Sequence, residues 1–422
     1  MSGVNLSEAY KDYAIYLPSL QQGYAAYPLR NIDTVKQTDI PNGLVLSDLN
    51  FLSTDSSLWH CKHVLYSAGQ FSTATVSTPD IVSTRKEHTV VIGDSGGFQV
   101  GTGKLPAIQS WKKFKNNPEA VYRKWIRERS IRDTVLRWLD RYCDYAMTLD
   151  MPLWILTEKK KAKASPFGKL TAQQLIELSV ENLRYFADKR GAATGARAKY
   201  LNVLQDAGGG TGEAWYAAVK DFDFEGWAFG GDTKSGLEPI LKWVRILRDD
   251  KKLDRAEWLH ILMASPPRHA VYLTAIQRIL RKQLGSDITI SYDSSSPFQS
   301  AGVRHKIARV PTLTNALRTW SIPMQDFPQS PKYRQQDAVE YLHSCPSPIT
   351  QRFSINDMHN RRNQFAQTFL STAGVQLLTN HNMYVYHKTA HDACDIVFKD
   401  EDASRIPSEI ERNLELISQY LE

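Results

Sequence analysis

Short apolar runs that alternate with longer stretches of helical periodicity most constrain the fold of this chain. Alternating strands and helices favour parallel pairing, because each helix returns the chain to the edge where the previous strand began. Eight strand and helix units close a parallel sheet into a barrel. The sequence therefore predicts an α/β fold, a (β/α)8 TIM barrel with insertions. The candidate strands are residues 43–49, 63–67, 89–93, 145–149, 200–204, 226–229, 259–264 and 288–292.

Between these runs, apolar residues recur at helical spacing. The predicted helices are residues 118–143, 171–187, 239–247 and 267–284, and the first of them is long enough to be two helices. Residues 323–331 have the proline content of a linker, and residues 407–421 form an amphipathic pattern at the end of the chain. We therefore expect a catalytic barrel with an N-terminal extension over residues 1–322 and a small α-rich segment over residues 323–422.

Composition is typical of a globular enzyme. The chain has 422 residues, of which 42% are hydrophobic, so it can bury a large core. No run of about 18 apolar residues occurs, and the first residues lack the basic start and apolar stretch of a secretory signal. The four cysteines are widely spaced, which favours reduced thiols over a disulfide framework. We expect a cytoplasmic protein without a membrane partner.

Two predicted strands end on an aspartate. Residues 94–99, Asp-Ser-Gly-Gly-Phe-Gln, follow the apolar run 89–92, and a second apolar run reaches Asp293. Taken singly, Asp94 is equally well explained by a tight turn, and a strand-end aspartate such as Asp293 is more often a cap. Because the carboxyl ends of barrel strands converge on one face, the sequence predicts that the two carboxylates meet across one substrate.

Five segments, in the same order along the chain, resemble the signature motifs of the tRNA-guanine transglycosylases. These enzymes exchange guanine for a 7-deazaguanine base without breaking the phosphodiester backbone. The resemblance covers about residues 40–305 and implies the same barrel and a pentosyltransferase activity. The matching segments are residues 94–99, 145–150, 202–205, 226–231 and 291–293.

The resemblance implies two catalytic residues. Asp293 would attack C1′ of the nucleotide and hold it as a covalent intermediate, as in retaining glycosidases. Asp94 would protonate the leaving guanine and take a proton from N9 of the incoming base. Because the nucleophile keeps the nucleotide while the bases exchange, no cofactor is required.

The same resemblance implies how the base is read. An ionised Asp150 would accept from the N1-H and N2-H groups, while the Gln205 amide and the Gly226 amide would donate to O6. The Trp227 carbonyl would lie near the position-7 substituent. On the residues alone, Gln205 and Met263 are as readily core or surface residues. The predicted substrate-binding residues are Ser95, Phe98, Asp150, Gln205, Gly226, Trp227 and Met263.

The formal net charge of +7 is concentrated in clumps that follow the acidic strands. If the strands are parallel, these clumps lie in loops on the face that holds both carboxylates, where they could bind a phosphate backbone. A solvated charge run is the usual explanation for any one clump. Neighbouring Trp111, Phe114 and Trp154 could stack on bases, although packing is the commoner role. The predicted nucleic-acid-binding residues are Lys112, Lys113, Lys159, Lys160, Lys161, Arg304 and Lys306.

Departures from the family pattern indicate the substrate. The nucleophile strand continues as Ser-Ser-Ser-Pro-Phe-Gln over residues 294–299, without the arginine that reads the anticodon in the tRNA enzymes. Asp232 stands where enzymes that accept an aminomethyl base carry glutamate, which favours the neutral nitrile base 7-cyano-7-deazaguanine (preQ0). The chain thus resembles the DNA-modifying branch, the DpdA-type DNA-guanine transglycosylases of phages and genomic islands. It would act on a flipped or single-stranded guanine of DNA, in the host cytoplasm if phage-encoded.

Zinc is not favoured. Family members bind structural zinc through three clustered cysteines and a histidine, whereas only Cys345 precedes His381 here. A substitute set of His343, Cys345, His359 and His381 is conceivable, but we predict no metal.

Two alternative functions remain open, a tRNA-guanine transglycosylase and a noncatalytic base-binding partner subunit. The sequence is also compatible with a homodimer or a partner protein.

Overall fold

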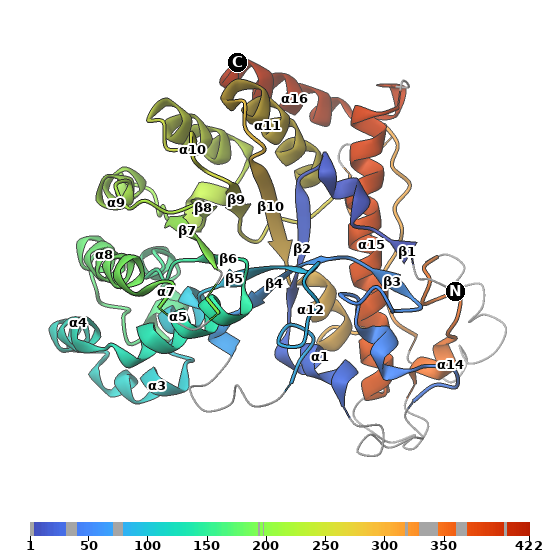
Figure 1. The fold of residues 1–422 in the computed structure, drawn as a ribbon, viewed down its shortest axis with the longest axis horizontal. Coiled ribbons are helices and arrows are strands. Elements are labelled where there is room, and N and C mark those ends of the chain that lie inside the picture. The colour runs from blue at the N-terminus through green and yellow to red at the C-terminus, as the bar shows by residue number, and fades with distance from the viewer. Residues whose placement is uncertain are drawn as a thin grey trace.

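Eight parallel strands close into a barrel in the order β10-β2-β4-β5-β6-β7-β8-β9 (Figure 1). The computed structural model describes residues 4–30, 40–70, 79–192, 195–196, 198–316, 320–328, 345–359, 369–400 and 403–422. The predicted (β/α)8 TIM-barrel fold is therefore confirmed. The barrel strands are β2 (Ile15–Leu20), β4 (His63–Ser67), β5 (Val90–Asp94), β6 (Tyr145–Met147), β7 (Lys199–Leu204), β8 (Gly226–Phe229), β9 (Trp258–Ile261) and β10 (Thr289–Ser294).

The first barrel strand differs from the prediction. Residues 43–49 do not form a strand and end in a 3-10 helix, η4 (Leu46–Leu49), whereas β2 comes from the presumed N-terminal extension. Pro18 within β2 hides the strand from pattern reasoning, because proline has no N–H to donate to a ladder. The position tolerates it, since β10 pairs with Ile15 to Pro18 and β4 pairs only with Ser19 and Leu20.

Helices follow the strands and surround the barrel (Figure 1). The Thr171 side chain caps α8 in a capping box with Gln174, so this helix begins where predicted. The arginine-rich segment 118–143 divides into two helices, and Glu128 accepts from the Ser130 N–H at the start of the second. The helices are α2 (Gly97–Gly101), α3 (Pro106–Gln109), η6 (Ser110–Phe114), α4 (Pro118–Arg127) and α5 (Ser130–Tyr142) after β5; α6 (Trp154–Thr157), α7 (Lys159–Ala164) and α8 (Ala172–Lys189) after β6; α9 (Thr211–Val219) after β7; η7 (Gly231–Lys234) and α10 (Leu237–Asp249) after β8; α11 (Arg268–Leu284) after β9; and α12 (Ser296–Gly302) after β10.

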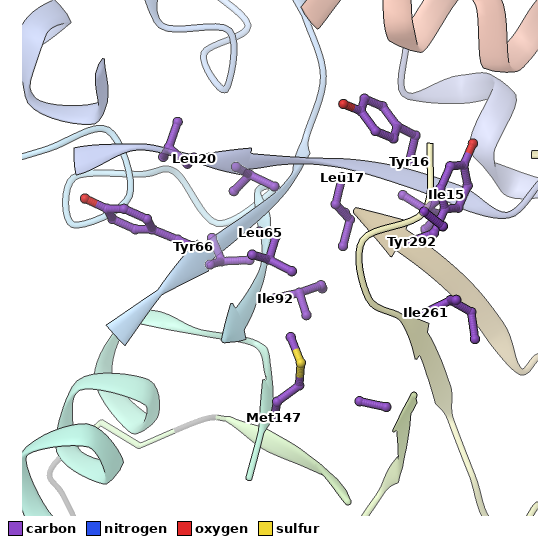
Figure 2. Close-up of a cluster of buried hydrophobic side chains, with 14 of the residues drawn as sticks. Ile15, Tyr16, Leu17, Leu20, Leu65, Tyr66, Ile92, Met147, Ile261 and Tyr292 are labelled. Atoms are coloured by element: carbon purple, nitrogen blue, oxygen red, sulfur yellow. The ribbon is translucent and has the colours of Figure 1, made fainter. Parts of the chain in front are cut away.

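Apolar side chains fill the barrel. Figure 2 shows Leu17, Leu65, Ile92 and Met147 pointing toward one another from four strands, and all four are fully buried or nearly so. Inward residues of alternate strands pack in layers in this fold, so the barrel is a solid support and not a pore. All four cysteines are also buried. The core therefore holds the strand ends in fixed positions for the site above it.

The C-terminal segment packs on the side of the barrel. The long helix α15 (Thr372–Phe398) lies against α11, α12 and β2, and 20 of its 27 residues are buried, so it is covered on most sides. Within the described ranges, no helix combines the length and apolarity needed to cross a bilayer. The predicted linker 323–331 contains a strand instead, because β12 (Met324–Asp326) pairs antiparallel with β11 (Lys306–Ala308). The predicted terminal helix is α16 (Ser408–Leu421).

Smaller elements complete the described part of the chain. They are β1 (Val4–Asn5), which pairs with β3 (Trp59–His60), η1 (Glu8–Lys11), α1 (Gln22–Ala26), η2 (Tyr27–Leu29), η5 (Ala68–Gln70), α14 (Ile355–Met358) and η9 (Ala403–Arg405).

Candidate active site

Three carboxylates meet at the carboxyl end of the barrel. Asp94 is the last residue of β5, Asp293 lies near the end of β10, and Asp150 follows β6 by three residues. The charge of Asp293 raises the pKa of Asp94, and the charge of Asp94 raises the pKa of Asp150. Charges that perturb one another in this way share one low-dielectric region. The structure thus brings together the two carboxylates that the sequence singled out and places Asp150, the predicted reader of the base, beside them.

The backbone around Asp94 is held in a tight turn. Gly96 has a φ of 83°, and a Cβ there would lie 2.6 Å from the Cα of Gly69, so only glycine fits. The Gly96 N–H donates to Asp94 Oδ1 at 3.1 Å. Burial raises the pKa of Asp94, and the Ser67 hydroxyl and the Gly96 amide only partly oppose this effect. The turn therefore positions a carboxyl group whose pKa is raised.

Ser95 has a hydrogen bond within the protein. Its hydroxyl donates to the carbonyl of Thr148 at 3.1 Å, and the residue is almost completely buried. This bond ties the end of β5 to the end of β6. The Ser95 side chain therefore helps to position the Asp94 turn, and its predicted role in substrate binding stays a prediction.

Asp150 and Gln205 form a buried pair. Gln205 Nε2 donates to Asp150 Oδ2 at 2.6 Å, while Gln205 Oε1 is buried without a hydrogen-bond partner among the described residues. Burial and the nearby Asp94 charge raise the pKa of Asp150 to about 7, against the lowering effect of the Gln205 hydrogen bond. An unmet acceptor beside a carboxylate of raised pKa suits a ligand edge that presents several N–H donors.

Glycines allow close approach to this pair. A Cβ at Gly97 would lie 2.5 Å from Asp150 Oδ1, and Cβ atoms at Gly230 and Gly231 would lie 2.8 and 2.7 Å from the Gln205 amide. Side chains at these positions would displace the pair. The backbone of the Gly230 and Gly231 turn therefore lies directly against Gln205.

Gly226 and Trp227 lie at the start of β8. Gly226 pairs with Leu201 and Trp258, four residues before the Gly230 turn. At about 3.3 Å per residue, it lies roughly 13 Å below that turn. The Trp227 indole is buried and donates to the carbonyl of Lys252. The base contacts of the Gly226 amide and the Trp227 carbonyl stay predictions, and Gly230 and Gly231 are the glycines that lie against Gln205.

Asp293 is held from two sides. The Met263 N–H donates to Asp293 Oδ1 at 2.7 Å, and His260 Nε2 lies 3.4 Å from the same oxygen. Met263 has a φ of 58°, an unusual backbone conformation for a residue with a side chain. Its side chain is 77% exposed, as expected of a residue that covers a ligand face. Strained backbone of this kind is concentrated at functional sites.

A chain of hydrogen bonds behind Asp293 fixes the histidine. The Trp258 indole donates to Ser291 Oγ at 2.6 Å, and Ser291 Oγ lies 2.9 Å from His260 Nδ1. When the Ser291 hydroxyl donates to Nδ1, the ring proton is on Nε2 and faces Asp293. Sequence reasoning missed His260. A polar residue in the middle of the apolar strand β9 was the available signal.

A lysine also lies near Asp293. Burial lowers the pKa of Lys234, and the charges of Asp293 and Asp232 act in the opposite direction. Lys234 ends η7, directly after the glycine turn beside Gln205. The site therefore contains a partly desolvated ammonium group that the sequence did not indicate.

An aromatic rim borders the site. Phe98 is 45% exposed in the first turn of α2, and its ring lies 5.6 Å from that of Trp154. Lys161 Nζ lies over both rings, at 5.6 and 5.7 Å. An exposed aromatic ring backed by a cation is suited to stack on a base. Trp111 is buried between aromatic side chains and packs, so its alternative role as a wedge is excluded.

The predicted basic residues occupy two regions. Lys112 and Lys113 lie in η6 and Lys159, Lys160 and Lys161 in α7, and both helices follow the acidic strand ends. Arg304 and Lys306 lie instead at the β11–β12 hairpin, where Lys306 is ion-paired with Asp326 at 3.4 Å. The first region adjoins the aromatic rim through Lys161, and the second belongs to the part of the chain that contacts α15.

The histidines considered for zinc are engaged in other contacts. His381 Nδ1 lies 2.7 Å from Ser347 Oγ and Nε2 lies 2.7 Å from the Ala308 carbonyl. His359 Nε2 lies 2.9 Å from the Pro328 carbonyl, and His343 falls outside the described residues. No cluster of three or more potential metal ligands occurs within the ranges that the structure describes. The contacts of His381 give it a role in anchoring α15.

No family model matches the chain, and no curated protein is significantly similar to it. The chemistry of the site must therefore be inferred from its own side chains and from the motifs that they form.

Proposed function

We propose that this protein is a DNA-guanine transglycosylase, a pentosyltransferase that replaces guanine in DNA by a 7-deazaguanine base. The observation that carries this proposal is the meeting of the half-buried Asp94 with the buried Asp150 and Asp293 at one end of the barrel. Base exchange at C1′ needs a nucleophile, a proton carrier and a reader of the guanine edge. Each of the three carboxylates has the surroundings that one of these tasks requires.

Asp293 acts as the nucleophile. Its carboxylate attacks C1′ as the bond between C1′ and N9 breaks, and the electron pair of that bond leaves with guanine. The Met263 amide donates to Oδ1 and His260 Nε2 lies 3.4 Å from it, which leaves Oδ2 for the attack. His260 acts as a positioning residue, because it touches the nucleophile and not the substrate.

Asp94 carries the proton. Its raised pKa lets it hold a proton for the leaving guanine, and once ionised it accepts the N9 proton of the incoming base. The covalent nucleotide is then attacked by N9 of the new base, and Asp293 leaves as a carboxylate. The exchange is balanced without an oxidant, a reductant or a nucleotide triphosphate, so no cofactor is required.

Asp150 and Gln205 read the base. When ionised, Asp150 accepts from N1-H and N2-H, and the adjacent Gln205 amide supplies the partner for O6 after it rotates away from Asp150. Gly230 and Gly231 permit the close approach of the purine edge. The Phe98 ring and the Met263 side chain are the two exposed groups available for its faces.

The substituent at position 7 is proposed to be a nitrile. Asp232 replaces the glutamate that the tRNA enzymes use for an ammonium group, and its charge acts on the nearby Lys234. Because the Asp232 carboxylate already interacts with the Lys234 ammonium group, it would stabilise the ammonium group of an aminomethyl base only weakly. This favours preQ0 over an aminomethyl base.

DNA is the proposed polymer, with the target guanine flipped out or single-stranded so that C1′ is accessible. Residues 295–302 support this choice. Ser295 precedes α12 and Ser296 and Pro297 begin it, so no arginine stands at the place where the tRNA enzymes contact the anticodon. The basic residues of η6 and α7 would hold the backbone. A cytoplasmic location is consistent with this role.

The test is base exchange with labelled guanine. The protein is incubated with labelled guanine and either single-stranded DNA, duplex DNA or tRNA, and the label in the polymer is counted; preQ0 is then added and the nucleosides are identified by mass spectrometry. We expect label in DNA and its replacement by preQ0. Label only in tRNA would identify the chain as a tRNA-guanine transglycosylase. Base binding without exchange in any polymer would identify it as a noncatalytic base-binding subunit.

A further inference from the structure

A groove lined by lysines lies beside the aromatic rim. It has a volume of about 470 Å³ and is lined by Lys115, Lys159, Lys163 and Lys169, with no carboxylate among its described lining residues. The lysines come from three segments: the turn after η6, the helix α7 and the turn that follows α7. We call it the lysine groove.

The four lysines lack counter-charges. None of them is ion-paired with a described residue, whereas lysines on other surfaces are, such as Lys242 with Glu213 and Lys86 with Asp55. Lys159 and Lys163 are four residues apart on α7, so they project from one face of the helix. Like charges that face the same hollow repel one another, and this cost is relieved when a polyanion binds.

The groove adjoins the aromatic rim. Ile155 and Leu156 line it and directly follow Trp154, whose ring lies 5.6 Å from that of Phe98. Lys161 lies over both aromatic rings and is paired with Glu158, on the face of α7 opposite to Lys159 and Lys163. The rim and the groove thus border two faces of one short helix, and a phosphate backbone in the groove would lie next to a base at Phe98.

We propose that the lysine groove binds the phosphodiester backbone of single-stranded DNA next to the target nucleotide. The inference rests on the proposed function only for the identity of the strand. A backbone site of this kind neutralises phosphates without reading bases, so its affinity falls steeply with salt. It would hold the strand after the target base has left the stack, which offsets part of the cost of flipping.

The test uses a DNA that cannot be exchanged. A fluorescent oligothymidylate about 20 nucleotides long contains no guanine, so its binding is independent of transglycosylation. Anisotropy titrations over a salt series give the affinity and the salt slope. A quadruple variant, K115Q/K159Q/K163Q/K169Q, is compared with a control, K220Q/K242Q/K252Q/K282Q, which removes the same charge from α9, α10, α11 and their adjoining loops.

The expected result is specific to the groove. The groove variant should bind the oligothymidylate about 10- to 100-fold more weakly at low salt, with a slope smaller by about 2 to 3 units, while the control keeps most of the affinity. Both variants should keep the circular dichroism spectrum and the guanine affinity of the wild type. Equal losses in the two variants, or no loss in the groove variant, would overturn the proposal.

Two further outcomes separate this inference from the proposed function. The wild-type protein could exchange no base while the groove variant still loses oligothymidylate binding. That result would support the lysine groove as a DNA-binding site and contradict the proposed transglycosylase activity. Tighter binding of oligouridylate than of oligothymidylate, with the same loss in the groove variant, would overturn the assignment to DNA in favour of RNA.

Discussion

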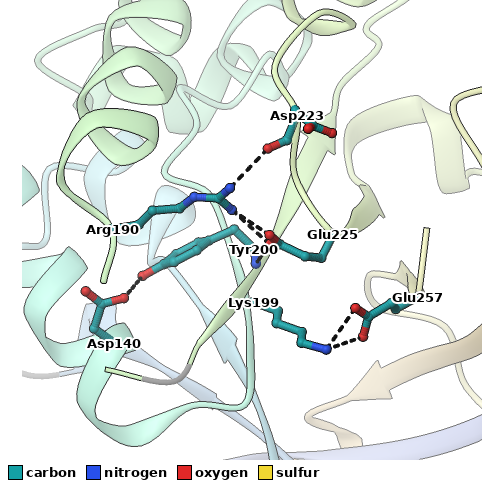
Figure 3. Close-up of polar contacts among 7 residues, drawn as sticks. All are labelled: Asp140, Arg190, Lys199, Tyr200, Asp223, Glu225 and Glu257. Atoms are coloured by element: carbon teal, nitrogen blue, oxygen red, sulfur yellow. Dashed lines mark hydrogen bonds and ion pairs between the residues drawn. The ribbon is translucent and has the colours of Figure 1, made fainter. Parts of the chain in front are cut away.

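At the amino end of the barrel the acidic side chains bind arginine, lysine or tyrosine side chains. At the carboxyl end Asp94, Asp150 and Asp293 meet, and no described arginine or lysine lies within ion-pair distance of them. Figure 3 shows the amino end, where Arg190 binds Glu225 through two contacts of 2.9 Å and Lys199 binds Glu257. In the same network the Tyr200 hydroxyl donates to Asp140 at 2.7 Å. Carboxylates thus have a charged partner or a tyrosine hydroxyl at the amino end of the barrel, whereas at the carboxyl end they lie beside one another.

The pKa values follow this difference. Burial alone would raise the pKa of Glu257, but hydrogen bonds from Lys199 and Tyr145 outweigh it and hold the pKa below its usual value. At the other end, burial and neighbouring carboxylates raise the pKa of Asp94 and Asp150. Paired charges at the amino end tie loops to the barrel. Carboxyl groups of raised pKa at the carboxyl end reduce stability at neutral pH, and in the proposed mechanism Asp94 uses its raised pKa for proton transfer.

The largest expected effect is from the nucleophile. Asp293→Asn should lower the rate of labelled-guanine exchange into DNA by more than about 10³-fold, because the amide cannot form the covalent nucleotide. Denaturing gel electrophoresis should detect a protein–DNA adduct in the wild type only. Guanine binding, measured by calorimetry, should persist in the variant. An Asp293→Asn protein with undiminished exchange would contradict the mechanism and favour a noncatalytic role.

A smaller effect is expected from the positioning residue behind Asp293. His260→Gln should lower kcat about 10- to 100-fold, the loss expected when a polar group held against the charged nucleophile is removed, with little change in guanine affinity. Ser291→Ala should have a weaker effect in the same direction, because Nδ1 loses the donor that fixes the ring tautomer. Equal losses of kcat and of base affinity in both variants would indicate a general packing defect instead.

Much of the barrel could be predicted because its strands are short, apolar and followed by helices. The strand β2 could not, since Pro18 contradicts a strand pattern, and only the register between β10 and β4 shows why it is tolerated. The helix α15 also escaped prediction. It is buried on most sides, so it lacks the single apolar face by which surface helices are recognised.

The candidate-site residues that lie at strand ends could be predicted from the sequence. Asp94 and Asp293 are adjacent in sequence to apolar strands, and parallel topology alone brings them together. The closeness of Gly230 and Gly231 to Gln205 was not predicted, because a string of glycines does not specify which one lies beside a given side chain. His260 and Lys234 were missed because their significance depends on the Asp293 carboxylate, which lies 33 and 59 residues further along the chain.

A pH titration of base binding sharpens the comparison further. Asp150 must be ionised to accept from guanine, and its pKa of about 7 means that it is mostly protonated in mildly acidic solution. The guanine affinity should therefore rise up to about tenfold per pH unit toward pH 7 and level off above it. Asp150→Asn should bind weakly without this dependence. A pH-independent affinity in the wild type would show that Asp150 does not read the base.

The same shift predicts the stability of the Asp150→Asn variant. A carboxyl whose pKa is raised on folding contributes stability at pH values below its unfolded pKa of about 3.9, and this contribution is lost as the pH rises through its folded pKa. Removing the charge should therefore stabilise the protein at pH 8 relative to the wild type, and the gain should vanish near pH 4. Thermal unfolding at both pH values measures this difference.

The smallest effect is expected at the amino end. Glu257→Gln removes the charge that Lys199 and Tyr145 bind, but the Lys199 and Glu257 side chains are 48% and 42% exposed, so solvent screens the pair. The free energy of unfolding should fall by at most about 1 kcal/mol, less in high salt, and the exchange rate should not change. Urea unfolding in low and high salt, alongside the exchange assay, measures both. A loss of exchange as large as that of His260→Gln would show that the amino end also contributes to catalysis and that the division between the two ends is wrong.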